Sequence, residues 1–393
     1  MPAGSYSVQV ATTLDALEAL RPVWTKWAVS LEADFNYFLY AVTHDSAVLR
    51  PCVIAVYEGS VARAMLVGYV RTRRAFAVVS FLNIPGPHER VLVIKKGARL
   101  GQPSIVIDGL LAAELLRIVR SGGVDSLSFE RMSLQSDLFL QIQQLRGFLV
   151  KKRVLHVFPY SVLKLAVPQP GKASREVRRK THNLNRAFPG QVQLKCFTLP
   201  DELNTGLRDA MRVAVTTWQH YLYDGVGSTA QTADAFRFFA QQGWLRVYVL
   251  YINQSPCAYL IGQLYNNTFY CQRPGYDPQF SRFSVGSLLT ALAFENLAVI
   301  GVQSVDLGEG GQEHNRRIGC EKSGEGTLHI CSPTLRGLRL SVFLGALRTV
   351  QKCGRRTRLT LHLDWLSRSW RQFLLSKWRS SETPGSSDAQ RSI

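Results

Sequence analysis

Acidic residues are scarce in this sequence, and its cysteines and histidines are not grouped. The 393 residues include 28 Asp and Glu against 47 Lys and Arg, so the formal net charge is +19. A balance this basic favours an anionic partner, such as an anionic cofactor, a nucleic acid, an anionic lipid or an acidic polymer. The seven cysteines form no Cys-x-x-Cys pair, and the histidines form no cluster at ligand spacing. This argues against a disulfide framework or structural zinc, and for a reducing compartment.

Long apolar runs and common catalytic motifs are also missing. No uninterrupted apolar stretch reaches the roughly 18 to 20 residues that a membrane-spanning helix needs. Residues 1–20 show no basic segment followed by an apolar one, so we expect a cytoplasmic protein. No Gly-x-Ser-x-Gly, His-Glu-x-x-His or P-loop pattern occurs, which weakens hydrolase, metalloprotease and NTPase interpretations.

A series of predicted elements occurs twice. Each half contains a helical start, a three-strand meander, a helix and a strand, which favours two related α/β (α+β) domains. In the first half we predict strands at 5–10, 48–57, 61–70, 75–81, 124–129, 153–157 and 160–167, a loop at 83–88, and helices from 13 through Trp27, at 105–119 and at 134–148. In the second half we predict strands at 191–197, 245–252, 257–265, 268–271 and 302–307, and helices at 174–188, 202–221 and 232–241.

The composition also suggests where the domains end. Residues 168–171, Pro-Gln-Pro-Gly, are the best candidate for a linker. We therefore predict one domain at 1–167, a second at 168–333, and a basic helical tail at 334–393.

Residues 274–298 are the stretch around which the second half is organised. A strand leads into a Pro/Gly/Asp loop, and a helix then starts at Ser284-Val-Gly-Ser287. A helix N-terminus offers unpaired backbone N–H groups and the positive end of the macrodipole, so it can take a phosphate. Ser284 is a predicted N-cap, and Gly286 permits close backbone approach. An ordinary crossover without a ligand explains the same stretch.

Four features carry a family resemblance. They are the basic segment Arg-Glu-Val-Arg-Arg-Lys-Thr-His-Asn-Leu-Asn-Arg at 175–186, Gly-Tyr-Asp-Pro at 275–278, Ser-Val-Gly at 284–286, and Asp-Leu-Gly-Glu-Gly-Gly-Gln-Glu-His-Asn-Arg-Arg-Ile-Gly at 306–319. Together with the order of meander, loop and helix, they resemble GNAT acetyltransferases of the cellulose-biosynthesis (CelD/BcsL-like) type. The resemblance is good over residues 170–320 and weaker over 1–165.

The resemblance implies tandem GNAT-like domains, each a mixed, mostly antiparallel sheet flanked by helices. The first domain would be degenerate and the second catalytic. It implies acetyl-CoA or another acyl-CoA as cofactor, no metal, and direct attack by an amine or hydroxyl acceptor in a ternary complex. A splayed strand near Leu260 and Gly262 would hold the donor, and the helix start would bind its phosphates through Ser284, Val285, Gly286 and Ser287.

Three titratable residues are candidates for the base that such a reaction needs. His314 titrates nearest to neutral pH, although it can equally be an exposed residue of a short helix. Glu313 can orient a substrate or pair with Arg316 or Arg317 at helical spacing. Asp306 is either a site carboxylate or a cap for the turn at Gly308. For the acceptor we predict contacts from Trp218, Tyr221, Tyr276 and Arg316, while Trp218 and Tyr221 also fit a core position.

The sequence departs from the family at two places. It has Glu-His-Asn at 313–315 where the family has Glu-Tyr-Lys, and the helix start lacks the full Gln/Arg-x-x-Gly-x-Gly/Ala loop. Three hypotheses follow. The first is an acyltransferase acting on a small-molecule or saccharide acceptor in exopolysaccharide or cell-envelope metabolism. The second is an aminoacyl-tRNA-dependent ligase like the FemABX enzymes, whose tRNA would suit the charge. The third is a non-catalytic binding module.

The C-terminal segment 359–379 is predicted to contact an anionic membrane. Leu363, Leu366, Trp370, Phe373, Leu374 and Trp378 fall near one helical face, and basic residues accompany them. Such a helix can lie in a membrane interface, where each Lys or Arg contributes roughly 1 kcal/mol. The same face also fits a groove of the second domain. On the membrane interpretation, truncation after Arg358 should abolish co-sedimentation with anionic vesicles and leave a soluble, folded protein. Aggregation of the truncated protein would instead place the helix in the fold.

Overall fold

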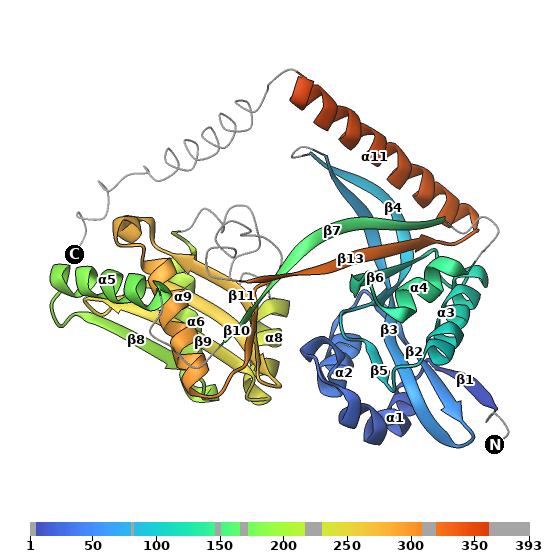
Figure 1. Ribbon diagram of the computed structural model, residues 1–393, viewed down its shortest axis with the longest axis horizontal. Coiled ribbons are helices and arrows are strands. Elements are labelled where there is room, and N and C mark those ends of the chain that lie inside the picture. Colours follow the sequence, from blue (N-terminus) through green and yellow to red (C-terminus); the bar gives the residue numbers. More distant parts are fainter. Residues whose placement is uncertain are drawn as a thin grey trace, which may run out of the picture. The chain divides into compact units, whose positions relative to one another are not determined.

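The chain forms two compact units in a computed structural model (Figure 1), which describes residues 5–79, 82–145, 151–165, 172–216, 230–308 and 320–360. Unit 1 consists of Met1–Val162 and Glu309–Gln351. Unit 2 consists of Leu163–Gly308 and Lys352–Ile393. Each unit contains a sheet with helices packed against it, and the two are described separately.

The sheet of unit 1 has the strand order β1-β2-β3-β4-β6-β13-β7, and β5 pairs with β3. Strands β1 to β4 form an antiparallel meander. Strand β6 then pairs parallel to β4, with Val91 opposite Ser126 and Ile94 opposite Phe129. The strands are β1 (Tyr6–Ala11), β2 (Val48–Glu58), β3 (Val61–Val79), β4 (Leu82–Ile94), β5 (Arg99–Gly101), β6 (Ser126–Ser133), β7 (Lys151–Lys164) and β13 (Glu321–Cys331).

The helices of unit 1 begin at recognisable caps and bury an aromatic core. The Thr13 hydroxyl accepts from the Ala16 N–H, and the Asp34 carboxylate accepts from the Tyr37 N–H. Trp24 is fully buried, and its ring packs edge-on against Phe35 with 5.0 Å between ring centroids. The helices are α1 (Leu14–Trp27), η1 (Leu31–Ala33), α2 (Phe35–His44), α3 (Ile105–Arg120) and α4 (Asp137–Gln144), together with α11 (Leu335–Thr360), which belongs to unit 1 as far as Gln351.

Unit 2 has the strand order β12-β11-β10-β9-β8. The Tyr248 hydroxyl donates to Asn296 of α9, and the Tyr251 hydroxyl donates to Asp209 of α6, so these helices cover opposite faces of the sheet. Helix α5 packs against η2 and α9. The elements are α5 (Lys172–Ala187), β8 (Val192–Phe197), α6 (Pro200–Ala214), α8 (Ala230–Gln241), β9 (Leu245–Ile252), β10 (Ser255–Tyr265), β11 (Thr268–Tyr276), η2 (Pro278–Phe283), α9 (Val285–Val299) and β12 (Ser304–Asp306).

The two units share one topology, as the repeated order of elements predicts. In each, an antiparallel meander is followed by a crossover helix and a strand parallel to the last strand of the meander. The crossover helix is α3 in unit 1 and α9 in unit 2. The predicted fold class, two α/β units with mixed and mostly antiparallel sheets, is confirmed.

Several predicted elements of unit 1 are wrong in detail. Strand β3 continues to Val79, so residues 75–79 of the predicted strand 75–81 belong to it, and the predicted loop at 83–88 lies inside β4. The predicted loop contains Pro85 and Pro87. Beyond Arg71, however, β3 pairs only with β4 within the described ranges, so the two strands form a two-stranded ribbon. Each strand of such a ribbon is an edge strand, where proline is tolerated. The predicted strands at 153–157 and 160–167 are one strand, β7. Helix α2 was not predicted.

The C-terminal part of the chain is divided differently from the prediction. Strand β13 lies in the predicted second domain, yet it pairs with β6 and β7 in the sheet of unit 1. The predicted linker at 168–171 lies outside the described residues, which resume at the first residue of α5. The predicted membrane-binding segment 359–379 also lies outside them beyond Thr360. Among the described helices, none has the length and apolar character needed to cross a bilayer.

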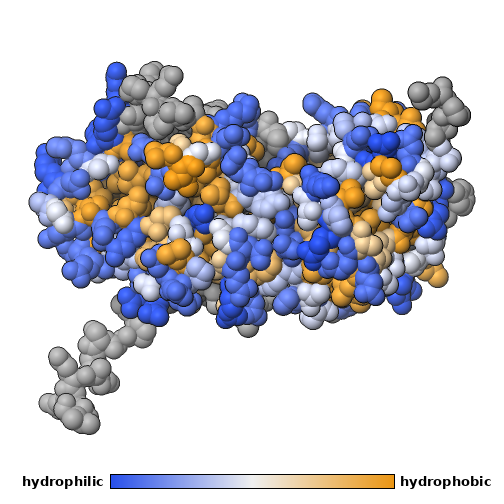
Figure 2. Space-filling model, turned by 90° about the horizontal axis from the view of Figure 1, so that it is seen from below, coloured by the Kyte–Doolittle hydropathy of each residue, from blue (hydrophilic) through white to orange (hydrophobic). Residues whose placement is uncertain are grey.

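Figure 2 shows hydrophilic residues around separate hydrophobic groups on one face.

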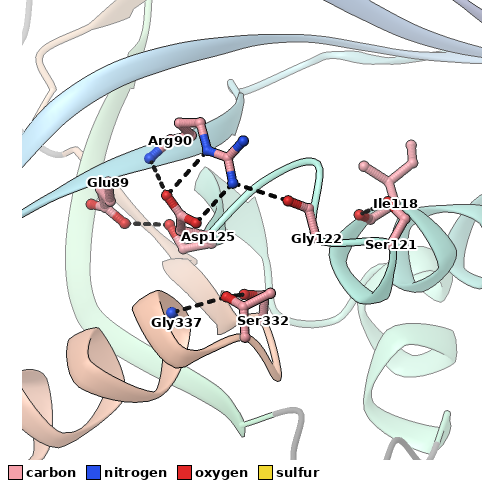
Figure 3. Close-up of polar contacts among 10 residues, drawn as sticks. Glu89, Arg90, Ile118, Ser121, Gly122, Asp125, Ser332 and Gly337 are labelled. Atoms are coloured by element: carbon pink, nitrogen blue, oxygen red, sulfur yellow. Dashed lines mark hydrogen bonds and ion pairs between the residues drawn. The ribbon is translucent and has the colours of Figure 1, made fainter.

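Asp125, through its buried carboxylate and its backbone, joins three segments of unit 1 (Figure 3). Asp125 is 1% exposed and accepts from the Arg90 backbone N–H at 2.8 Å and from the Arg90 guanidinium at 3.1 Å. The same guanidinium donates to the Gly122 carbonyl at 3.0 Å, and the Ser332 N–H donates to the Asp125 carbonyl at 3.0 Å. This network fixes the start of β6 to β4 and to the end of β13.

We predict that Asp125→Ala lowers the free energy of unfolding by about 2 to 3 kcal/mol, because it removes the buried carboxylate that accepts from both the backbone and the guanidinium of Arg90. Urea denaturation of the full chain measures this. Glu58→Ala is the control: its pair with Arg63 is one-third exposed on both sides, so the change should stay below about 1 kcal/mol. Equal effects of the two variants would contradict a structural role for the buried network.

Candidate functional site

The candidate site begins where β11 separates from β12 in unit 2. The two strands pair in parallel over three positions only, from Thr268 opposite Ser304 to Tyr270 opposite Asp306. Beyond Tyr270, β11 continues for six residues to Tyr276. Among the described residues, the edge of β11 that faced β12 pairs with no strand beyond Tyr270, so there its backbone groups can bind another partner.

A β-bulge lies at the start of the released edge. Ile261 of β10 pairs with Arg273 and Gly262 pairs with Cys271, so Gln272 is an extra residue on β11. Gly262 permits this close approach. A Cβ atom there would lie 2.4 Å from the Tyr270 carbonyl oxygen and 2.5 Å from the Phe269 ring. Any side chain at position 262 would push β11 away from β10.

The N-terminus of α9 follows directly from this strand through η2. Ser284 occupies the N-cap position in the left-handed conformation (φ 54°, ψ 40°), and its hydroxyl makes no capping hydrogen bond. Ser284 is thus the N-cap residue, as predicted, but its left-handed backbone replaces the extended geometry in which a serine side chain usually accepts a capping hydrogen bond. The carbonyl of Ser284 accepts from the Leu288 N–H at 3.0 Å. The N–H groups of Val285, Gly286 and Ser287 have no intrahelical acceptor.

Tyr276 lies at this helix start. A Cβ atom on Gly286 would lie 3.0 Å from the Tyr276 ring, so the ring packs on the glycine. Tyr276 is 43% exposed, and it closes β11 just before the turn into η2. Asp277 stabilises that turn by accepting from the Gln279 N–H at 2.9 Å. Gly286 and Tyr276, which the sequence assigned to the site, are thus in contact.

Asp306 lies at the point where the two strands separate. It is 5% exposed, and its Oδ1 accepts from the Gly308 N–H at 2.9 Å, which is the capping role considered for it. Its neighbour across the pair is Tyr270, and the next residue in the same row across the sheet is Gln263 of β10. Gln263 is fully buried, and its side-chain amide has no hydrogen-bond partner in the part of the chain that the structure describes. Sequence reasoning did not identify Gln263 or Gln272; only the break in strand alternation at Cys-Gln-Arg-Pro-Gly signals the bulge.

The remaining predicted residues divide into two groups. Leu260 and Gly262 lie on β10, which pairs with β9 on one side and β11 on the other. The splayed strand is thus β11 and not the segment around Leu260, because both edges of β10 are occupied; cofactor binding by Leu260 and Gly262 stays a prediction. The other group lies outside the described residues: Trp218, Tyr221, Glu313, His314 and Arg316.

Thiol nucleophiles are suppressed around the site. Desolvation, with a smaller contribution from the charge of Asp306, raises the pKa of Cys271 to about 12. Burial likewise raises the pKa of Cys257 to about 12, with Asp277 adding to the shift. These thiols stay protonated at neutral pH, so they are poor nucleophiles. Within the described ranges, no three His, Cys, Asp or Glu side chains are grouped to hold a metal ion.

Comparison with known proteins identifies the class of the second half. Residues 171–316 match the model of a family described as an acetyltransferase (GNAT) domain. No curated protein matches the chain. The match includes α5, all five strands of unit 2, α9 and the separation of β11 from β12. Over these residues the chain is therefore similar to a GNAT-type acetyltransferase domain.

Solved structures are similar in fold over most of the chain. A protein of unknown function from Bacteroides thetaiotaomicron is similar with a TM-score of 0.53 at 10% identity, covering 82% of this chain and 100% of that one. FemX is similar with a TM-score of 0.52 at 8% identity, covering 74% and 90%. L-PGS from Bacillus licheniformis has a TM-score of 0.48 at 12% identity, covering 86% and 97%. With the repeated topology, the first two support tandem GNAT-like domains.

Proposed function

We propose that unit 2 transfers an acetyl or related acyl group from acyl-CoA to an amine or hydroxyl acceptor, in exopolysaccharide or cell-envelope metabolism. The observation that carries this proposal is the released edge of β11 leading into the open N-terminus of α9, inside the segment that matches the GNAT domain. The backbone of the released edge offers hydrogen bonds to an extended acyl donor. The N–H groups of Val285, Gly286 and Ser287 offer an anion site for its phosphates.

Direct attack by the acceptor is the chemistry that this site supports best. The protonated thiols of Cys257 and Cys271 argue against a covalent acyl-cysteine at these positions. The acceptor then has to lose a proton as it attacks the thioester carbonyl. Asp306 is our candidate for the base among the described residues, because its buried carboxylate lies where the strands separate. His314 and Glu313 remain candidates from the sequence.

Gly286→Val should weaken acetyl-CoA binding at least about tenfold, because it obstructs the helix start and displaces the Tyr276 ring. Isothermal titration calorimetry measures the dissociation constant. Gly109→Val is a matched control in α3, the crossover helix of unit 1, where a Cβ would meet only the Gln141 amide oxygen at 3.6 Å. An unchanged affinity in a folded Gly286→Val protein would place the pyrophosphate elsewhere.

Asp306→Asn should lower turnover by about 10² to 10⁴-fold, the range typical of a lost general base, and leave acetyl-CoA affinity unchanged. The asparagine oxygen can still accept from the Gly308 N–H, so the turn is preserved. Release of free CoA thiol measures turnover. Asp277→Asn is the control, since this carboxylate also caps a turn in unit 2. If Asp306→Asn retains wild-type turnover, the base is His314, Glu313 or another group.

Aminoacyl transfer from tRNA is the second candidate, and the net charge of +19 favours it. The likeness to FemX concerns the fold alone. Thermal-shift titration separates the two candidates, since a ligand that binds only the folded state raises the melting temperature. Stabilisation by acetyl-CoA supports the first candidate, and stabilisation by tRNA alone supports the second.

A further inference from the structure

Helix α5 has an inner face that is fixed in unit 2. The helix packs against η2 and α9, the two elements that form the helix-start part of the candidate site. Leu184 is 1% exposed on this inner face. Just beyond the helix, the ring of Phe188 packs edge-on against Phe283 of η2, with 5.4 Å between ring centroids. The orientation of α5 about its own axis is therefore set by burial.

The outer face of α5 carries a line of basic residues that we name the α5 stripe. It consists of Arg175, Arg179, His182 and Arg186, all of them exposed. Their spacing of four, three and four residues keeps them within roughly 60° around the helix axis, and the line is about 16 Å long at 1.5 Å per residue. None of the three arginines has an ion-pair partner within the described part of the chain.

An unpaired basic line of this kind is unfavourable in the isolated helix. Arg175 and Arg179 are like charges at i and i+4, and so are His182 and Arg186 whenever the histidine is protonated. The repulsion would be relieved by an anionic partner along the stripe. Guanidinium groups donate in a fork that matches phosphate oxygens, so phosphate is the anion that the stripe suits best.

The narrowness of the stripe favours a flat partner. Asn183 and Asn185 lie on its two sides, and Arg178 on one flank already makes another interaction. A helix inserted into a nucleic-acid groove meets phosphates on both sides, so it needs cations on both flanks. A plane of headgroups can instead contact all four members of one straight line. The stripe contains no apolar residue, so such contact would be electrostatic and sensitive to salt.

We propose that the α5 stripe docks the protein on the phosphate headgroups of an anionic lipid surface. This surface is distinct from the acyl-transfer site and does not depend on that activity. It is also distinct from the segment 359–379. The net charge of +19 adds a general attraction, whereas the stripe gives the contact a position and an orientation.

The test compares two triple variants of the full chain with the same net charge. Arg175→Gln/Arg179→Gln/Arg186→Gln removes the stripe. Its matched control is Arg208→Gln/Arg212→Gln/Arg237→Gln, which removes three exposed arginines from α6 and α8, on the side of the sheet opposite α9. Binding is measured by co-sedimentation with phosphatidylcholine vesicles that contain phosphatidylglycerol, over a series of lipid and salt concentrations. Circular dichroism melts check that both variants are folded.

The stripe variant should bind these vesicles about a hundredfold more weakly than the wild type, the loss expected for three cations at an anionic surface. The control should lose much less, and pure phosphatidylcholine should bind none of the proteins. Three results would overturn the proposal: no binding by the wild type, equal losses in the two variants, or a stripe variant that loses binding to duplex RNA but keeps binding to vesicles. The last result would make the partner a nucleic acid.

Discussion

The short pairing of β11 with β12 is the constraint on which the candidate site depends. Two strands that paired along their full length would leave no backbone group for a ligand. Here the pairing stops at Tyr270 and Asp306, and the bulge at Gln272 follows at once. The bulge in turn requires the close approach of β10 and β11 that only glycine permits at position 262. The strand that is released then leads through η2 into α9, so one segment provides both the free edge and the open helix start.

Unit 1 shows what the same topology looks like without an open helix start. Its crossover helix α3 has Asp108 in the first turn, 5% exposed, and the Arg99 guanidinium donates to this carboxylate at 2.8 Å. The protein's own negative charge thus already occupies the positive end of the helix dipole. The first turn of α9 contains no acidic residue. This contrast supports unit 2 as the unit that binds an anionic cofactor, and it supports a structural role for unit 1.

The sequence predicted most of unit 2 because its strands are apolar and its turns are marked by Asn, Gly and Pro. The crossover helix at 285–299 and its position after a strand and a loop followed from spacing alone. The left-handed conformation of Ser284 did not, because serine is an ordinary cap residue and tertiary packing selected the unusual backbone. The family resemblance placed the splayed strand near Leu260, on β10, whereas β11 is the strand that separates from its neighbour. Strand pairing and register cannot be read from the sequence of one strand. In unit 1, the buried network around Asp125 depends on contacts between distant segments, which no local pattern shows.

Helix α5 connects the candidate site with the proposed docking surface. Its inner face touches η2 and α9, and its outer face carries the stripe. A helix with its side chains is about 10 to 12 Å across, so a surface bound to the stripe would lie about one helix diameter from the elements that lead into the start of α9. The arginines of the stripe can be replaced without altering the packed side of α5, which makes docking and catalysis separable by mutation.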